Sequence, residues 1–202
     1  MTNQGRPRLK FYTLHNLDQL PQIDKLSDEH RHAIDVVARV LPFRANSYVV
    51  DELIDWDNVP EDPIFQLTFP QPGMLGDRQF RQMESAILSG CGDAEINSVI
   101  ESIRRELNPH PEGQLQHNVP RLDDEPVPGV QHKYRETVLV FPSAGQTCHA
   151  YCSFCFRWAQ FVGMPDLKLA TDESMRFCEY LRRHKEVTDV LITGGDPMVM
   201  RT

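Results

Sequence analysis

The fold is decided by residues 137–155, which read TVLVFPSAGQTCHAYCSFC. The run from Thr137 to Phe141 is apolar and rich in β-branched residues and Pro142 follows it, so it predicts a short buried strand. Residues 172–184 predict a helix and residues 187–193 a second strand. Strand, loop, helix and strand within about 60 residues predict a βαβ unit, which implies a parallel sheet.

The residues before this unit follow a different pattern. Residues 1–108 predict a mostly helical region, in which residues 44–69 are irregular and three segments carry an apolar stripe at helical spacing, over about 27–41, 77–88 and 93–107. Five prolines between residues 109 and 131 predict a linker arm. The expected organisation is therefore a helical region over 1–108, a Pro-rich arm over 109–131 and a first, incomplete βαβ unit over 132–202.

Composition and charge exclude several classes of partner. The 202 residues carry a formal net charge of −8, which opposes binding to phosphate backbones, so nucleic acid is not expected. The sequence contains no apolar run near the length of a membrane span and no secretion signal at its start. A cytoplasmic location is expected, where clustered cysteines usually serve metal or redox chemistry.

Three cysteines, Cys148, Cys152 and Cys155, lie within eight residues in a C-x3-C-x2-C pattern. Thiolates are the usual ligands of iron–sulfur clusters, and three of them leave one iron of a four-iron cluster without a protein ligand. Two other interpretations are a zinc site with His149 as fourth ligand and a structural disulfide. Cys91 and Cys178 fall on predicted helices and are interpreted as small buried hydrophobic residues.

A second candidate segment, Gly194-Gly195-Asp196, follows the second strand. Two glycines here are typical of a tight turn, and they would also let a ligand approach the backbone while the carboxylate meets an ammonium group. Both candidate segments follow the carboxyl ends of adjacent parallel strands. Ligands bind at that end in α/β sheets and barrels.

With these motifs the sequence resembles the radical S-adenosylmethionine (SAM) superfamily and, more narrowly, the lysine 2,3-aminomutase family. The supporting segments are Leu41–Phe43, Asp62–Gln71, Pro126–Tyr134 and Leu191–Asp196. The resemblance implies an α/β fold, the start of a partial (β/α)6 TIM-like barrel preceded by the helical region. Such a barrel needs about six βα units. The chain is therefore expected to be the N-terminal part of a longer enzyme or a truncated reading frame, too short to be active alone.

The resemblance also implies cofactors and site residues. A [4Fe–4S] cluster on the three cysteines would bind SAM, whose amino end Gly194, Gly195 and Asp196 would hold. Phe154 would lie near the adenine. Arg157 would meet the carboxylate of an amino acid substrate, or else balance the charge of the cluster. The implied enzyme is an isomerase that shifts an amino group between adjacent carbons of an amino acid. The resemblance also implies an electron donor such as flavodoxin or ferredoxin, and a homo-oligomer is the expected assembly. No catalytic residue is assigned.

Pyridoxal phosphate (PLP) is a further cofactor that the resemblance implies. The relatives hold its phosphate partly with two arginines before the first strand, where this chain has His132-Lys-Tyr-Arg-Glu-Thr137. Lys133 offers a point charge to a phosphate, but Thr137 cannot replace a cation. Two alternatives therefore stand beside the aminomutase: a radical SAM enzyme without PLP, and a zinc-binding or degenerate fragment that acts as a binding module.

Overall fold

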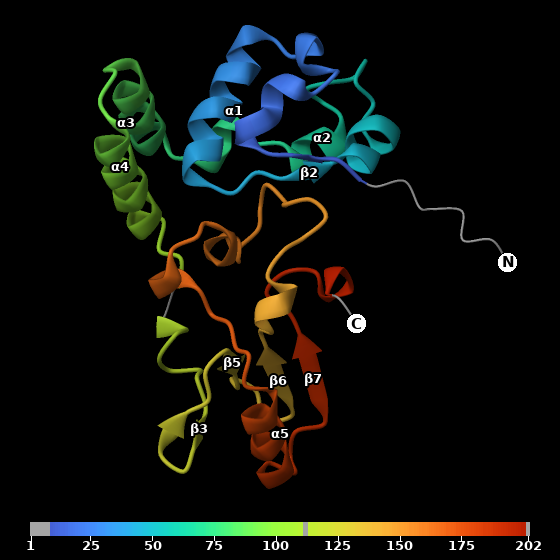
Figure 1. Ribbon diagram of the computed structural model, residues 1–202, viewed down its shortest axis with the longest axis vertical. Coiled ribbons are helices and arrows are strands. Elements are labelled where there is room, and N and C mark those ends of the chain that lie inside the picture. Colours follow the sequence, from blue (N-terminus) through green and yellow to red (C-terminus); the bar gives the residue numbers. More distant parts are fainter. Residues whose placement is uncertain (1–8, 111–112, 201–202) are drawn as a thin grey trace, which may run out of the picture. The chain divides into compact units, whose positions relative to one another are not determined.

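A computed structural model describes residues 9–110 and 113–200, and it divides the chain into two compact units (Figure 1). Unit 1 comprises Met1–Glu106 and His149–Cys155, and unit 2 comprises Leu107–Cys148 and Phe156–Thr202. The cysteine motif is thus shared: Cys148 belongs to unit 2, whereas Cys152 and Cys155 belong to unit 1.

Unit 1 is mostly helical. Its α-helices are α1 (Asp28–Val40), α2 (Pro63–Thr68), α3 (Asp77–Leu88) and α4 (Asp93–Glu106), and the short strands β1 (Phe11–Tyr12) and β2 (Ala45–Asn46) pair antiparallel. Its shorter turns are the 3-10 segments Leu14–Gln19, Ile23–Lys25 and Pro72–Met74 and the π-helical turn Val49–Leu53.

Helix α1 confirms the predicted first helix and shows why it forms. Ser27 caps it, because its Oγ accepts a hydrogen bond from the His30 amide at 3.2 Å. Pro42 follows its end, where Arg104 of α4 donates to the carbonyl oxygens of Val40 and Arg39 at 2.7 and 3.2 Å. The apolar stripe of α1 is buried, and it consists of Ala33, Ile34, Val36, Val37 and Val40.

Helix α2 corrects the prediction that residues 44–69 are irregular. Asp62 caps this helix by accepting a hydrogen bond from the Phe65 amide at 2.7 Å, and Pro63 occupies its first position. Phe65 and Phe69 are fully buried and stack with ring centroids 4.8 Å apart. Helix α2 is therefore fixed in the aromatic core of unit 1.

Unit 2 contains a three-stranded sheet in the order β5 (Val130–Gln131), β6 (Thr137–Val140) and β7 (Asp189–Ile192). Strands β6 and β7 are parallel and are joined through α5 (Ser174–Arg183), which confirms the predicted βαβ unit. Strand β5 pairs antiparallel with β6 and comes from the segment predicted as an arm. That segment also forms the hairpin β3 (Arg121–Leu122) and β4 (Glu125–Pro126).

Helix α5 packs on the sheet through Tyr180, which is buried with Val138 and Val140, while Phe177 and Leu181 flank it. The interpretation of Cys178 as a buried residue is wrong, because its side chain is exposed. Successive residues of a helix are about a quarter turn apart, so Cys178 does not share the face on which Phe177 and Leu181 pack against the sheet. Unit 2 also contains the 3-10 segments Ser143–Gly145, Trp158–Phe161, Pro165–Leu167 and Pro197–Val199.

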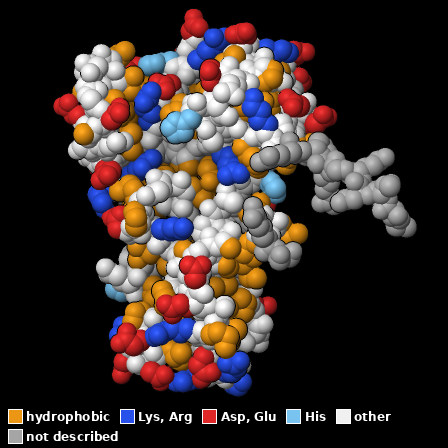
Figure 2. Space-filling view, viewed as in Figure 1, with side chains coloured by type: hydrophobic (Ala, Val, Ile, Leu, Met, Phe, Trp, Pro, Cys, Tyr) orange, Lys and Arg blue, Asp and Glu red, His pale blue; other side chains and the backbone are white. Residues whose placement is uncertain are grey.

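The fold class is mixed α/β, as predicted, and the strands of the described residues form small sheets without closing into a barrel. Strand β7 is an edge of its sheet, and Val190, Leu191 and Ile192 are exposed along it. Figure 2 shows hydrophobic side chains gathered over this part of unit 2. Within residues 9–110 and 113–200, no helix has the length and apolar character of a membrane span.

Candidate functional site

The part of the cysteine loop that belongs to unit 1 is anchored by backbone hydrogen bonds. The Tyr151 amide donates to the Arg44 carbonyl oxygen at 2.8 Å, and the Ser153 amide donates to the Leu67 carbonyl oxygen at 2.7 Å. The Cys155 amide donates to the Cys152 carbonyl oxygen at 3.0 Å, which closes a tight turn between the two cysteines. Cys152 is exposed and Cys155 half-buried.

The thiols show what this loop offers to a metal. Each of the five cysteines carries a thiol rather than a disulfide, which excludes the disulfide interpretation in this structure. Among the described residues, no group of three or more His, Cys, Asp or Glu side chains is placed to hold a metal ion. The donor set itself, three cysteines of which two share a turn, has the chemistry of an iron–sulfur ligand set. His149, the fourth ligand in the zinc interpretation, is exposed.

The glycine turn of unit 2 is shaped by close contact with the loop that precedes Cys148. Gly194 has a φ of +108°, and a Cβ there would lie 2.4 Å from the side chain of Gln146. A Cβ on Gly195 would lie 2.3 Å from the carbonyl oxygen of Thr147 and 2.4 Å from that of Gly145. The position that a side chain at Gly195 would occupy is thus taken by the backbone of the loop before Cys148.

Hydrogen bonds join the same two loops. The Asp196 amide donates to the Thr147 carbonyl oxygen at 2.8 Å, and Gln146 Nε2 donates to the carbonyl oxygens of Pro142 and Thr193 at 2.8 and 3.4 Å. Asp196 Oδ1 accepts from the Met198 amide at 2.9 Å, which orients its carboxylate. The structure therefore brings Gly194, Gly195 and Asp196 against the residue before Cys148, at the carboxyl ends of β6 and β7.

Arg157 is held among aromatic rings in unit 2. Its guanidinium carbon lies 4.5 Å from the ring centroid of Phe141 and 5.0 Å from that of Phe156. Both of its terminal nitrogens lie 3.5 Å from Oε1 of the buried Gln131, at the outer limit of a hydrogen bond. This arrangement fixes the orientation of the guanidinium plane.

Phe154 and Lys133 are both exposed, in different surroundings. The Phe154 side chain is 78% exposed and lines a shallow groove of about 530 Å³ in unit 1, together with Ser153 and residues of α2. Lys133 lies in the turn before β6, with its Nζ 5.8 Å from the ring centroid of Tyr134. Because β6 and β7 are parallel, Lys133, which precedes β6, and Gly194, which follows β7, lie at opposite ends of the sheet.

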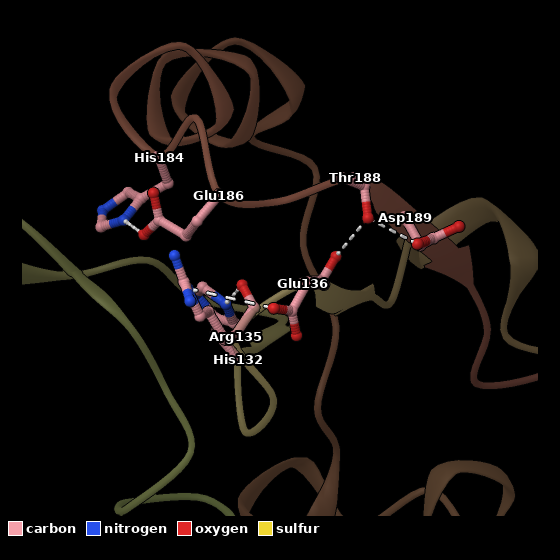
Figure 3. A network of polar contacts seen from close by, with 7 residues as sticks. All are labelled: His132, Arg135, Glu136, His184, Glu186, Thr188 and Asp189. Atoms are coloured by element: carbon pink, nitrogen blue, oxygen red, sulfur yellow. Dashed lines mark hydrogen bonds and ion pairs between the residues drawn. The ribbon is translucent and has the colours of Figure 1, made fainter.

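Sequence reasoning missed a polar network where β6 and β7 begin, and Figure 3 shows it. His132 Nε2 bonds to the Arg135 carbonyl oxygen at 3.2 Å, and its Nδ1 pairs with the Tyr180 hydroxyl. Since a carbonyl only accepts, the neutral His132 ring carries its proton on Nε2. No motif marks this network, because its members come from separate segments.

The second half of the network involves His184 and Glu186. His184 Nδ1 lies 2.9 Å from Glu186 Oε1, and this hydrogen bond is the largest cause of the lowered pKa of Glu186. Burial, followed by the charge of Glu186, raises the pKa of the Tyr180 hydroxyl. The Thr188 hydroxyl donates to the Asp189 carboxylate at 2.7 Å. The His132–Tyr180 pair ties α5 to the segment before β6, at the end of the sheet away from the glycine turn.

The chain is similar to several curated proteins. It is 30% identical over 180 residues to the "Putative L-lysine 2,3-aminomutase" of Aquifex aeolicus, an overlap that covers 89% of this chain and 37% of that protein. It is 23% identical over 189 residues to the L-lysine 2,3-aminomutase of Bacillus subtilis, covering 94% of this chain and 32% of that protein. It is 35% identical over 78 residues to that of Fusobacterium nucleatum, covering 39% and 18%.

No family model matches the chain, and no solved structure matches it. The chain spans about a third of the length of the two relatives that it matches over most of its own residues. The resemblance expected from the cysteine motif and the supporting segments is confirmed by these relatives. This chain therefore belongs to the radical SAM lysine aminomutase family.

Proposed function

We propose that this chain provides the cluster-binding and SAM-binding residues of a radical SAM enzyme of the lysine 2,3-aminomutase type, an isomerase that shifts an amino group on an amino acid. The contact that carries the proposal is the hydrogen bond from the Asp196 amide to the Thr147 carbonyl oxygen. It supports a common site because it joins the Gly-Gly-Asp turn to the residue that precedes the first cysteine. The relatives support the family in which such a site performs this chemistry.

Cys148, Cys152 and Cys155 would hold a [4Fe–4S] cluster. When bound, this cluster supplies the electron that breaks the sulfonium C–S bond of SAM and yields a 5′-deoxyadenosyl radical. The chain supplies three thiolates and a fixed turn between two of them, since the Cys155 amide is bonded to the Cys152 carbonyl oxygen. Three protein ligands leave one iron open to the amino and carboxylate groups of SAM.

Asp196 would hold the ammonium group of SAM. Its Oδ1 already accepts from the Met198 amide, so the carboxylate is oriented before a ligand arrives. Gly194 and Gly195 contribute indirectly, because their missing side chains let the turn pack against the loop before Cys148. Phe154, which is exposed beside α2, would contact the adenine.

Arg157 would bind the carboxylate of the substrate. The rings of Phe141 and Phe156 hold its guanidinium, and a held guanidinium loses little conformational entropy when it pairs with a carboxylate. Its second candidate role is to balance the charge of the cluster. The whole enzyme would use an electron donor such as flavodoxin or ferredoxin in the cytoplasm, and would assemble as a homo-oligomer.

The described residues do not form a phosphate cradle for PLP. Lys133 is exposed against Tyr134, and Thr137 occupies the β6 position where the relatives' pattern has an arginine. Thr137 therefore favours a second candidate function, a radical SAM enzyme without PLP. The exposed edge of β7 supports the larger architecture, a (β/α)6 barrel in which a further parallel strand would pair with β7.

The test is anaerobic reconstitution with iron and sulfide, followed by metal analysis. We expect about four irons per chain and a broad visible absorption band, whereas a colourless zinc protein would favour the binding module. Cys152→Ala should abolish cluster retention and Cys178→Ala should leave it intact, because Cys178 lies on α5 outside the motif. Equal loss in the two variants would contradict the ligand assignment.

A further inference from the structure

Helix α2 ends against the cysteine loop. The last carbonyl groups of a helix have no partner within it and need one elsewhere. In α2, the Leu67 carbonyl oxygen accepts from the Ser153 amide at 2.7 Å, and the Gln66 carbonyl oxygen accepts from the Ser153 hydroxyl at 2.7 Å. A single residue thus satisfies two consecutive carbonyl groups of α2.

Ser153 lies between two cysteines, so this contact bears on the thiols. On the other side of Cys152, the Tyr151 amide is bonded to the Arg44 carbonyl oxygen, and Ala150 packs against the core of unit 1. Cys152 is therefore flanked by two anchored residues, while its own side chain is exposed. The turn to Cys155 starts from this fixed point.

The support beneath Ser153 is rigid. Asp62 Oδ1 caps α2 through the Phe65 amide, and Asp62 Oδ2 accepts from the Asp55 amide at 3.2 Å. Phe65 and Phe69 fix the helix in the core by stacking. A ligand set is more precise when it rests on residues whose own conformations are locked by packing and hydrogen bonds.

We propose that Ser153 is a positioning residue, whose hydroxyl bond to α2 sets the spacing of the Cys152 and Cys155 sulfurs before iron binds. The proposal rests on the proposed function and extends it to a residue without a metal ligand atom of its own. In this proposal α2 supports the loop of residues 149–155, which carries Cys152 and Cys155. The backbone bond to Leu67 remains in any non-proline variant, so the hydroxyl can be tested by itself.

The experiment compares three variants of the chain. Ser153→Ala removes the hydroxyl, Ser153→Thr restores one, and Ser89→Ala is a matched control. Ser89 also lies in unit 1 and donates a hydroxyl bond at 2.9 Å to a helix carbonyl, that of Ala86. Hydrogen exchange of the 149–155 amides is measured on iron-free protein, and the rate of iron loss to a chelator is measured after reconstitution.

Ser153→Ala should speed both exchange in residues 149–155 and iron loss by about fivefold, the effect of one ordinary hydrogen bond. Ser153→Thr should recover most of the difference, and Ser89→Ala should change neither. If Ser153→Ala exchanges its amides and loses iron at wild-type rates, or if Ser89→Ala accelerates both equally, the positioning role of Ser153 is overturned. The assignment of the cluster to the three cysteines would be unaffected by that result. A wild-type chain that binds no cluster would instead overturn the proposed function, and this role for Ser153 with it.

Discussion

Replacing Gly195 with alanine tests the contact between the two loops of unit 2. The new Cβ would lie 2.3 Å from the Thr147 carbonyl oxygen, 2.4 Å from that of Gly145 and 2.5 Å from the Thr147 amide nitrogen. These are backbone atoms, so no side chain can rotate away. Ordinary contact distances require the loops to separate by about 1 Å.

The cost follows from two effects. Overpacking of this kind destabilises by about 1–3 kcal/mol, and loss of the bond from the Asp196 amide to the Thr147 carbonyl adds about 1 kcal/mol. The free energy of unfolding of unit 2 should therefore fall by about 2–4 kcal/mol. The loosened loop precedes Cys148, so cluster retention should fall as well.

Three further glycine-to-alanine variants distinguish a steric clash of the new Cβ from the backbone strain of a positive φ. Their free energies of unfolding are measured in urea, and the loosening of the loop is followed by hydrogen exchange of the amides of residues 143–148. Gly73 has open space around it and no positive φ, so it should be neutral. Gly90 has open space and a φ of +65°, so it should lose only about 1 kcal/mol. Gly194 combines a positive φ with contact to Gln146. If Gly195→Ala unfolds at the same urea concentration as Gly73→Ala, the close contact of the loops is refuted.

Further predictions concern stability and pH. Arg104→Ala should lower the urea midpoint by an amount equal to about 1–3 kcal/mol, because it leaves the Val40 and Arg39 carbonyls at the end of α1 without this donor. Asp62→Ala should cost about 1–2 kcal/mol through the lost cap of α2, and an unchanged midpoint would exclude the cap. Glu186 has a lowered pKa in the folded protein, so its stabilising effect is present above its ordinary value of 4.5 and is lost as the pH falls toward the folded value. The urea midpoints of wild type and Glu186→Gln should therefore differ at pH 7 and converge at low pH, and a constant difference would contradict the assignment.

Local signals were sufficient for much of the fold. Ser27 and Pro42 mark the ends of α1, and the apolar run before Pro142 marks β6, because each element carries its own cap, period or break. Helix α2 was not predicted from the sequence, because six residues are too few to show a helical period, although Asp62 and Pro63 form a helix start signal. Strand β5 was not predicted either, because its two residues form a strand only by pairing with β6.

The candidate site was predictable in its residues and less so in its contacts. The spacing of the cysteines indicates their chemistry without a structure. Position 195 requires glycine because of a tertiary contact: the loop that leaves no room for a side chain there lies about 50 residues earlier in the chain. The anchoring of Ser153 on α2 joins residues still further apart, and no local pattern marks it.

The discontinuity of unit 1 has a consequence for synthesis on the ribosome. Its first part is complete at Glu106, but the segment His149–Cys155 follows only after the polypeptide has begun unit 2. At about 5–20 residues per second, the nascent helices wait several seconds for that segment. During this interval water must solvate the end of α2, and the arrival of Ser153 completes the first unit at the same moment as the third cysteine emerges.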